Sequence, residues 1–348
     1  MKKLDTGIII GYGSIGKRHA KIMNEIVPKI IIIDNSKEKR ENAKSDYPNA
    51  MVYERIKDIK NWGEVTLGQA YSVISTLGPS HHKIFNLLAD NGIKKILCEK
   101  PMASSVNNAY QMHLRAKADG ISLVLNHYIR YSNLVDSLNE FSRSNSLGDP
   151  VSIVTGGGAS CIVTNGIHWI DFAMQLFRAS PNKVFSTSSE DKINPRSEDL
   201  GFYGGNAIWS FPDGREAVIS MTNLSSIAAR CKIFYRNAIV EFYDDLSVTI
   251  MHRDMDSIKR YPAITRTGYP KQLLYEGMLP NVNDFLGSLE RAHNDLIENN
   301  DNHICDSSIG LNSISTVIGA LFSGCENRPV QLPINPESDW GMYEWPIS

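Results

Sequence analysis

The first third of the chain alternates between short apolar runs and longer stretches with helical spacing. Runs such as TGIIIG at 6–11 and KIIIID at 29–34 are apolar throughout and rich in β-branched residues, which predicts buried strands. Further strands are predicted at 50–53, 70–75, 94–99 and 121–126. Because fully apolar strands that alternate with helices need cover on both faces, this part is predicted to form a doubly wound parallel sheet.

The pattern changes after about residue 127. Helical spacing recurs at 131–146, 166–178, 281–298 and 306–324. Apolar and polar positions alternate, as in strands with one buried face, at 150–155, 205–211, 215–222, 230–236, 238–243 and 246–251. We therefore expect an α/β protein, with a doubly wound parallel sheet at 1–126 and an α+β domain at 127–348 that holds a large, mostly antiparallel open sheet.

Composition and charge narrow the class of protein. Hydrophobic residues make up 42% of the chain, and 36 Lys and Arg nearly balance 38 Asp and Glu, which indicates no nucleic-acid partner and no membrane surface. We find no signal-peptide pattern and no apolar run near the ~18 residues that a membrane helix needs. The five cysteines have neither disulfide nor metal-ligand spacing, which favours reduced thiols, a cytoplasmic protein and no bound metal.

A glycine-rich loop, GYGSIG, follows the first predicted strand and opens the first predicted helix. Gly11 suits a tight turn, Gly13 lets the backbone approach a pyrophosphate, and Gly16 lets helix and strand pack closely. The helix N-terminus offers N–H groups and a positive dipole end to phosphates. The alternative is a glycine turn in an α/β domain without a nucleotide. The cofactor-binding residues predicted from this loop are Gly11, Tyr12, Gly13, Ser14, Ile15 and Gly16.

An acidic residue ends the second predicted strand. Asp34 lies eighteen residues after Gly16, where a carboxylate can accept hydrogen bonds from ribose hydroxyls, and Asn35 is beside it. A carboxylate repels a 2′-phosphate, so NAD is the predicted cofactor. Ser36, Lys37 and Arg40 could still tolerate NADP, which remains the alternative.

Four segments in this order, GYGSIGKRH, STLGPSHHK, CEKP and GIHWID, make the chain resemble the Gfo/Idh/MocA family, the relatives of glucose–fructose oxidoreductase and inositol dehydrogenase. The resemblance covers essentially the whole chain, and Glu-Lys-Pro after the fifth strand is its most specific part. It implies a Rossmann domain, a substrate-binding and oligomerisation domain, an NAD(P)-dependent dehydrogenase or reductase acting on CH–OH groups in carbohydrate metabolism, and a homodimer or homotetramer.

The resemblance also assigns site residues. Lys100 matches the active-site lysine of the family, and His168 matches its active-site histidine. On the cofactor side it implies Thr76, Leu77, Pro79, His82, Glu99, Lys100 and Pro101. On the substrate side it implies Asp171, Thr164, Asn165, Arg130 and Tyr131. Many relatives carry Asp at the position of Thr164, so either the substrate contact or the catalytic group differs here.

The chemistry expected of these residues follows from their charges. Pro101 stops the fifth strand and directs Lys100, whose ammonium can stabilise oxyanion character as a hydride leaves the substrate carbon. Glu99 can hold that ammonium in place and keep it charged. His168 and Asp171 are three residues apart and share a helix face, so the carboxylate can orient the imidazole that takes the hydroxyl proton.

Three functions compete at this point. The leading one is hydride transfer between the nicotinamide and a secondary hydroxyl or keto carbon of a sugar, cyclitol or sugar nucleotide. A second is an NADPH-dependent keto-sugar reductase in surface-polysaccharide or deoxysugar synthesis. A third is a non-catalytic NAD-binding sensor or scaffold, supported by Thr164 in place of Asp, whereas retention of Lys100 and His168 favours an enzyme.

The carboxylate of Asp34 predicts that NAD(H) binds more tightly than NADP(H), because it accepts from the ribose hydroxyls and repels a 2′-phosphate. Fluorescence titration with both cofactors checks this preference. Tighter binding of NADP(H) would contradict it and would direct attention to Lys37 or Arg40 as phosphate ligands.

Overall fold

The computed structural model describes residues 4–59, 69–191, 199–243, 245–253, 255–260, 272–299 and 302–348. The chain divides into two compact units. The first contains Met1–Tyr128, Leu289–Ile314 and Asn335–Ser348, and the second contains Ile129–Ser288 and Ser315–Ile334. The sequence analysis expected two contiguous domains divided after residue 126. The units instead interleave along the chain, because two C-terminal stretches pack with the N-terminal sheet.

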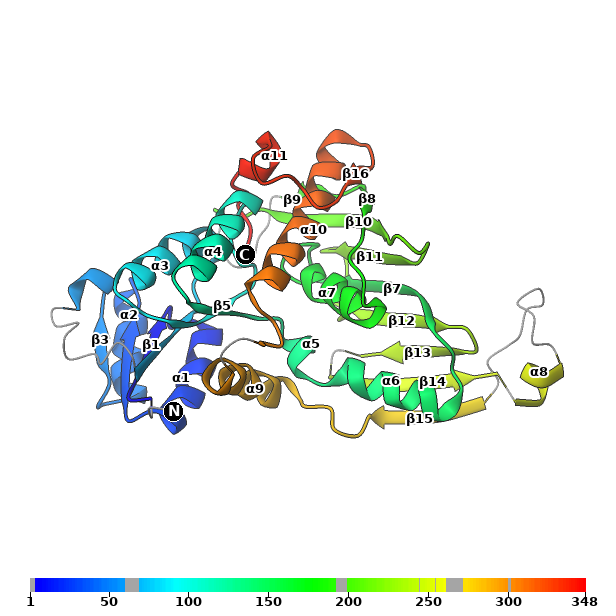
Figure 1. Ribbon diagram of the computed structural model, residues 1–348, viewed down its shortest axis with the longest axis horizontal. Coiled ribbons are helices and arrows are strands. Elements are labelled where there is room, and N and C mark those ends of the chain that lie inside the picture. The colour runs from blue at the N-terminus through cyan, green and yellow to red at the C-terminus, as the bar shows by residue number, and fades with distance from the viewer. Residues whose placement is uncertain are drawn as a thin grey trace. The chain divides into compact units, whose positions relative to one another are not determined.

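The first unit is built on a six-stranded parallel sheet in the order β3-β2-β1-β4-β5-β6. Its strands are β1 (Thr6–Ile10), β2 (Lys29–Ile33), β3 (Met51–Tyr53), β4 (Ala70–Ile74), β5 (Lys95–Glu99) and β6 (Ser122–Asn126). Its helices within the N-terminal stretch are α1 (Ser14–Ile26), α2 (Lys37–Asp46), η1 (Ile56–Asp58), α3 (Gly78–Asp90) and α4 (Val106–Ala118). The strand order reverses between β1 and β4, which is the doubly wound arrangement predicted from the sequence (Figure 1).

Burial explains why these runs become strands. All five residues of β1 are buried, and β4 is buried in the same way. Gly7 of β1 has no room for a side chain, because a Cβ there would lie 2.2 Å from the sulfur of Met23 on α1. The sheet and its helices therefore pack at close range, and the carboxyl ends of the strands are left to carry the polar residues.

Two C-terminal stretches complete the first unit. The first stretch includes residues 289–298 of helix α9 (Phe285–Glu298). The ammonium of Lys95 on β5 donates to the carbonyls of Leu296 and Ile297 near the end of this helix, at 2.8 and 3.0 Å. The amide of Leu125 on β6 donates to the carbonyl of Cys305 at 2.8 Å. Further along, α11 (Asp339–Met342) is followed by Trp345, whose amide donates to the carbonyl of Ser104 at 2.9 Å. Backbone acceptors thus tie these stretches to the N-terminal sheet.

The second unit contains a mixed sheet in the order β15-β14-β13-β12-β7-β11-β10-β8-β16, with β9 paired to β10. Its strands are β7 (Pro150–Gly158), β8 (Lys183–Ser186), β9 (Ser189–Asp191), β10 (Phe202–Ser210), β11 (Glu216–Thr222), β12 (Arg230–Tyr235), β13 (Ala238–Phe242), β14 (Ser247–His252), β15 (Gln272–Met278) and β16 (Val330–Gln331). The described pairs are antiparallel except β7 with β11. The mostly antiparallel open sheet is confirmed, whereas β8, β9, β15 and β16 were not predicted.

The helices of the chain's second half are α5 (Tyr128–Tyr131), α6 (Leu134–Asn145), α7 (Gly166–Phe177), α8 (Met255–Arg260), α9 and α10 (Ser307–Glu326). In Figure 1, α6 and α7 cover one face of the large sheet. Trp169 and Phe172 of α7 are buried and pack against Phe242 of β13, with ring centroids 5.4 and 5.7 Å apart.

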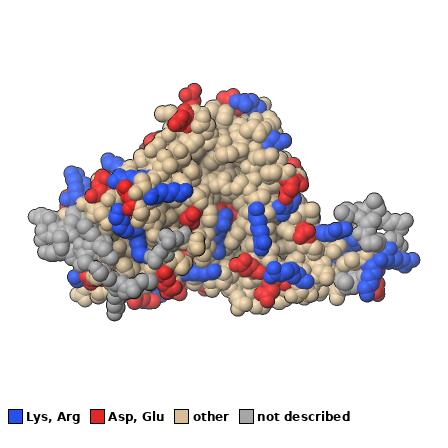
Figure 2. Space-filling view, in the orientation of Figure 1, with Lys and Arg blue, Asp and Glu red and all other residues tan. Residues whose placement is uncertain are grey.

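Among the described helices, α10 has a length and composition that the sequence patterns did not lead us to expect. By length and composition α10 could cross a membrane, with a mean hydropathy of 1.3 over its most apolar window. Of that window 61% is buried inside the structure, and a core helix of a soluble protein has the same properties. Charges of both signs are interspersed on the face of the molecule that Figure 2 shows, in keeping with the formal net charge of −2.

The other face of the large sheet carries an apolar stripe. Phe185, Ile208, Val218 and Val154 lie in register on the adjacent strands β8, β10, β11 and β7. Phe185, Ile208 and Val154 are 37–41% exposed, whereas their sequence neighbours point into the core. Four cross-strand apolar side chains in one row are a surface suited to association with a second copy of the chain.

A charge in this stripe should dissociate the expected homodimer or homotetramer. We expect Val218→Glu to give a monomer at micromolar concentration, because a carboxylate in an apolar interface loses its solvation. Size-exclusion chromatography with light scattering measures the mass. Leu224→Glu is the control, since Leu224 is 93% exposed and lies outside the strands. A monomeric unsubstituted protein would contradict the prediction.

Candidate active site

The glycine-rich loop connects β1 to α1, and its three glycines have different structural reasons. Gly11 has φ +97°, and a Cβ there would lie 2.6 Å from the carbonyl oxygen of Ser75. A Cβ on Gly16 would lie 2.0 Å from the carbonyl oxygen of Gly11. A Cβ on Gly13 would meet only the ammonium of Lys39, at 4.0 Å. Protein packing therefore explains Gly11 and Gly16 but not Gly13, whose open surface fits the approach of a pyrophosphate.

The N-terminus of α1 is arranged for an anion. Gly13 is its N-cap and supplies no side-chain cap, and the first turn contains no acidic residue. Ser14 is exposed and Ile15 is half-buried at this turn. Helix N-termini present free N–H groups and a positive dipole end. The loop thus fits the dinucleotide predicted from the sequence.

Asp34, at the end of β2, faces the same loop. Its two carboxylate oxygens accept from the backbone amides of Tyr12 and Ser36 at 2.7 and 2.8 Å. The side chain of Tyr12 is buried, and its hydroxyl donates to Asp46 of α2 at 2.8 Å, so Tyr12 contributes to the loop through its backbone. These bonds fix the carboxylate at the edge of the loop, where a ribose is expected.

Of the two cations that the sequence singled out, Arg40 lies at Asp34 and Lys37 pairs with another carboxylate, while a third cation was not foreseen. Arg40 donates to the carbonyls of Asp34 and Asn35, both at 2.9 Å, and Lys37 lies 3.8 Å from Glu41. The ammonium of Lys39 lies 4.0 Å from Asp34 Oδ2, beside Gly13. Lys39 was not predicted from the sequence. Which lysine of α2 faces the loop depends on the rotation of the helix about its axis, and distance along the sequence does not reveal that rotation.

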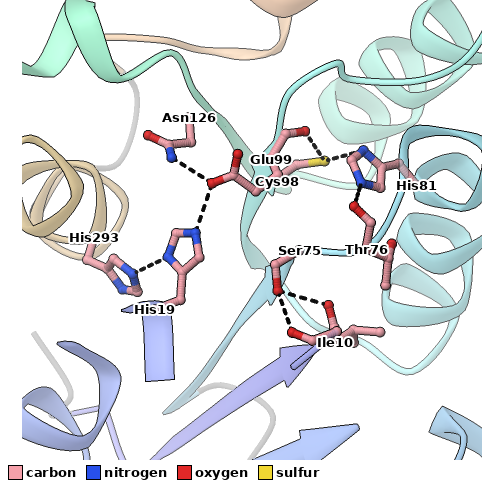
Figure 3. Close-up of polar contacts among 10 residues, drawn as sticks. Ile10, His19, Ser75, Thr76, His81, Cys98, Glu99, Asn126 and His293 are labelled. Carbon is pink, nitrogen blue, oxygen red and sulfur yellow. Dashed lines mark hydrogen bonds and ion pairs between the residues drawn. The ribbon is translucent and has the colours of Figure 1, made fainter. Parts of the chain in front are cut away.

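The segment after β4 joins two strand ends. The hydroxyl of Ser75 donates to the carbonyls of Ile10 and Gly11 at 3.1 and 2.8 Å, which links the ends of β4 and β1 (Figure 3). Thr76 Oγ1 bonds Ser80 at 2.6 Å, and Leu77 and Pro79 are exposed at the start of α3. The ends of two adjacent strands therefore present predicted cofactor residues at one edge of the sheet.

His81 holds this segment to the next strand end. Its ring nitrogens lie 2.9 Å from the carbonyl oxygen of Pro101 and 3.0 Å from that of Thr76, and burial lowers its pKa. His82, the histidine predicted to line the cofactor, is half-buried and bonds Asn86 at 2.9 Å. The buried neighbour His81 is thus the one that organises the predicted cofactor segment.

Glu99 and Lys100 follow β5. Glu99 is buried, and its Oε1 accepts from His19 Nε2 at 2.9 Å and from Asn126 Nδ2 at 2.6 Å (Figure 3). Burial raises the pKa of Glu99, but the bonds from His19 and Asn126 and the charge of Lys100 outweigh it and lower that pKa below its usual value. Lys100 is half-buried, and its peptide bond to Pro101 is cis. The sequence analysis named Glu99 as a holder of Lys100 but missed His19 and Asn126.

The second unit carries the predicted substrate residues around the start of α7. His168 is half-buried in the first turn, and Asn165 is the N-cap, with its Oδ1 accepting from the amide of Cys161 at 3.2 Å. Thr164 is buried, and its amide donates to the sulfur of Cys161 at 3.2 Å. Residues 161–165 therefore form a compact turn that leads into the helix.

Arg130 and Asp171 form a pair that the sequence analysis did not anticipate. Arg130 Nε donates to Asp171 Oδ2 at 2.7 Å, and both side chains are largely buried. Tyr131, beside Arg130 on α5, is buried as well. The predicted task of Asp171 was to orient His168, three residues away on α7. That role stays a prediction, and the bond from Arg130 adds a partner on a second helix, which spacing along α7 does not reveal.

The predicted catalytic pair is divided between the units, with Lys100 in the first and His168 in the second. Each unit therefore contributes one of the two residues on which the predicted chemistry depends. Among the residues that the structure describes, no group of three or more His, Cys, Asp and Glu could hold a metal ion.

The different packing of Gly13 and Gly16 gives a matched pair of variants. Gly13→Ala should keep the melting temperature and weaken NADH binding about tenfold or more, because its Cβ meets no backbone but obstructs the phosphate approach. Gly16→Ala should lower the melting temperature, since overpacking typically costs about 1–3 kcal/mol. Thermal unfolding and fluorescence titration measure both. Unchanged NADH binding in Gly13→Ala would contradict the assignment of this loop.

Solved structures share this fold over nearly the whole chain. An oxidoreductase from Agrobacterium radiobacter, in complex with NAD+, L-tartaric acid and magnesium, is 15% identical, with 95% of this chain and 98% of that one covered and a TM-score of 0.71. The WlbA dehydrogenase from Bordetella pertussis, in complex with NADH and UDP-GlcNAcA, is 16% identical (95% and 100% covered, TM-score 0.69). The UDP-N-acetylglucosamine 3-dehydrogenase GnnA from Acidithiobacillus ferrooxidans is 16% identical (91% and 97%, TM-score 0.66).

At these identities the structures establish the fold alone, and no curated protein matches the chain. A family model matches the N-terminal part of the sequence. Residues 7–127 match the family model GFO_IDH_MocA, described as "Oxidoreductase family, NAD-binding Rossmann fold". The match spans GYGSIGKRH, STLGPSHHK and CEKP, three of the four segments that suggested the resemblance, whereas GIHWID lies outside it. Residues 7–127 therefore match the NAD-binding Rossmann domain of the Gfo/Idh/MocA oxidoreductase family.

Proposed function

We propose that the protein transfers a hydride between NAD and a secondary hydroxyl or keto carbon of a sugar or sugar nucleotide. The observation that carries this proposal is the meeting of three strand ends in the first unit. Ser75 ties the end of β4 to the glycine loop after β1, and the ring of His81 lies between the carbonyl oxygens of Thr76 and of Pro101 after β5 and, when neutral, donates to one of them. Lys100 is thereby held at the same sheet edge as the loop, beside the point where strand order reverses and ligands bind.

The substrate class is supported by two neighbours and by the polar residues of the second unit. One neighbour is a UDP-N-acetylglucosamine 3-dehydrogenase, and another was solved with NADH and UDP-GlcNAcA. Arg130 and Asp171 place a guanidinium donor and a carboxylate acceptor side by side. A donor and an acceptor together suit the hydroxyl groups of a sugar, each of which both donates and accepts.

The roles of the residues follow from their chemistry. Gly13 and the N-terminus of α1 would hold the pyrophosphate, and Asp34 would accept from the ribose hydroxyls. Bound NAD supplies the nicotinamide carbon that takes up the hydride. Lys100 stabilises negative charge on the substrate oxygen, and His168 accepts the hydroxyl proton. In the opposite direction His168 returns that proton to the oxygen of a reduced carbonyl.

The position of Lys39 favours a second candidate, an NADPH-dependent keto-sugar reductase. Its ammonium lies 4.0 Å from Asp34 Oδ2, where it can offset the repulsion between that carboxylate and a 2′-phosphate. The catalytic roles of Lys100 and His168 are the same in this direction. Binding titrations with both cofactors separate the two candidates.

Removal of the Lys100 ammonium should reduce turnover and leave cofactor binding nearly intact, because its stabilisation is realised in the transition state. We expect Lys100→Met to lower kcat about 10²–10³-fold, the usual effect of losing one preorganised donor. A panel of sugars and sugar nucleotides, assayed by nicotinamide absorbance with both cofactors, supplies the measurement.

Three further variants sharpen this test. His168→Asn should give a loss of similar order that shrinks at high pH, where hydroxide replaces the base. The double variant should lose less than the product of the single losses, because both residues serve one proton-transfer step. Thr164→Asp restores the usual family residue and reports on the substrate contact. Near-normal turnover of Lys100→Met on the substrate that the panel identifies would refute the proposed role of Lys100.

A further inference from the structure

A row of four buried polar side chains ends at Glu99, directly before Lys100. Tyr71 OH lies 3.2 Å from His293 Nδ1, His293 Nε2 lies 2.8 Å from His19 Nδ1, and His19 Nε2 lies 2.9 Å from Glu99 Oε1. Tyr71, His293 and His19 are fully buried, and Glu99 is 7% exposed. Figure 3 shows His293, His19 and Glu99 in this row. Its members come from four elements, β4, α9, α1 and β5.

The donors in this row are fixed when its histidines are neutral. Ionised Glu99 only accepts, so His19 must carry its proton on Nε2 and accept on Nδ1. His293 must then donate from Nε2, and its Nδ1 must accept from the hydroxyl of Tyr71. Burial, with a smaller contribution from the charge of His19, holds the pKa of His293 well below its usual value. Burial also raises the pKa of Tyr71, which keeps its hydroxyl protonated.

The same row can hold one more proton without losing a hydrogen bond. If His19 gains a proton on Nδ1, it donates to His293 Nε2, and His293 then donates from Nδ1 to the oxygen of Tyr71. Two hydrogen bonds reverse direction, and the bond from His19 to Glu99 stays. Buried histidines usually resist protonation because the new donor lacks a partner. Here His293 Nε2 accepts the new N–H of His19, and the donor that loses its described acceptor is the hydroxyl of Tyr71, at the far end of the row from the new charge.

The extra proton changes the charge beside Lys100. With His19 neutral, the pair of His19 and Glu99 has a charge of −1, and with His19 protonated it is neutral. The charge of Lys100 acts on Glu99 and lowers its pKa, and by linkage Glu99 favours the ammonium of Lys100.

The other described groups around Glu99 are held neutral. Asn126 from β6 is an uncharged donor. Burial lowers the pKa of His81 from α3 and raises that of the Cys98 thiol well above its usual value. The proton on His19 is therefore the variable charge that these elements place behind Lys100.

We propose that Tyr71, His293 and His19 store a proton behind Glu99 and so set the charge that Glu99 presents to Lys100. His293 and Tyr71 are positioning residues in this proposal, because they act through His19 and Glu99. Its consequence for turnover rests on the proposed function of Lys100. The coupling itself is a property of the first unit and can be measured without substrate.

The test is an NMR titration of the protein labelled at lysine Cε and in the histidine rings, with the Lys100 signal identified by its absence in Lys100→Met. In the unsubstituted protein the Lys100 signal should show a step that coincides with the titration of one histidine of the row. In His293→Leu the Nδ1 proton of His19 loses its acceptor, so this step should move to lower pH by about 1–2 units.

His293→Gln is the matched control. Its amide can accept from His19 Nδ1–H or donate to His19 Nδ1, so the step should stay near its original pH. If His293→Leu fails to fold, Tyr71→Phe gives the same test, because it removes the final acceptor and keeps the ring. An unchanged step in His293→Leu, or equal shifts in the Leu and Gln variants, overturns the proposal. Turnover of Lys100→Met separately decides the proposed function.

Discussion

The first unit depends on the hydrogen bonds that stabilise one buried carboxylate, that of Glu99. Glu99 ends a strand whose three preceding residues, Ile96, Leu97 and Cys98, are apolar and buried, and it accepts hydrogen bonds from His19 and Asn126. Removing one partner from a buried charge typically costs about 3–5 kcal/mol. Helix α1 and strand β6 must therefore keep their positions relative to β5. The same helix begins at the glycine loop, so the requirement of Glu99 also fixes the loop.

This constraint accounts for the return of the chain to its N-terminal unit. The ring of buried His19 needs a partner at Nδ1, and its described partner there is His293 on α9, 2.8 Å away. Lys95 then anchors the end of α9 through two carbonyls. The hydrogen bonds of His19 and Lys95 thus explain why residues 289–314 pack with the first unit. A contiguous division of the chain would leave Nδ1 of buried His19 without its bond to His293.

The two units contribute different chemistry. In the proposed function, the first would provide the backbone that binds the phosphates, a ribose acceptor in Asp34 and the ammonium of Lys100. The second provides His168 and the pair of Arg130 and Asp171, on helices that the large sheet supports. Rigid strand ends and helix starts suit such residues, because small errors in position weaken transition-state stabilisation strongly. The departure at Thr164 lies in the second unit, which is where a change of substrate can be accommodated without disturbing the cofactor loop.

Local patterns in the sequence determined most of the fold and the cofactor loop. Apolar runs and their spacing determined β1, β2, β4, β5 and β6, because a strand buried on both faces leaves a continuous signal. The glycines of the loop and Asp34 were evident for the same reason, since each acts through its own backbone or over a short distance. Short strands such as β8 and β16 were not, because two to four residues carry too little periodicity. Only the tertiary structure decided that His293 bonds His19, that Asp171 bonds Arg130, and that Lys39 is the lysine that faces the loop. Each of these contacts joins separate elements, and their geometry depends on packing that no local pattern records.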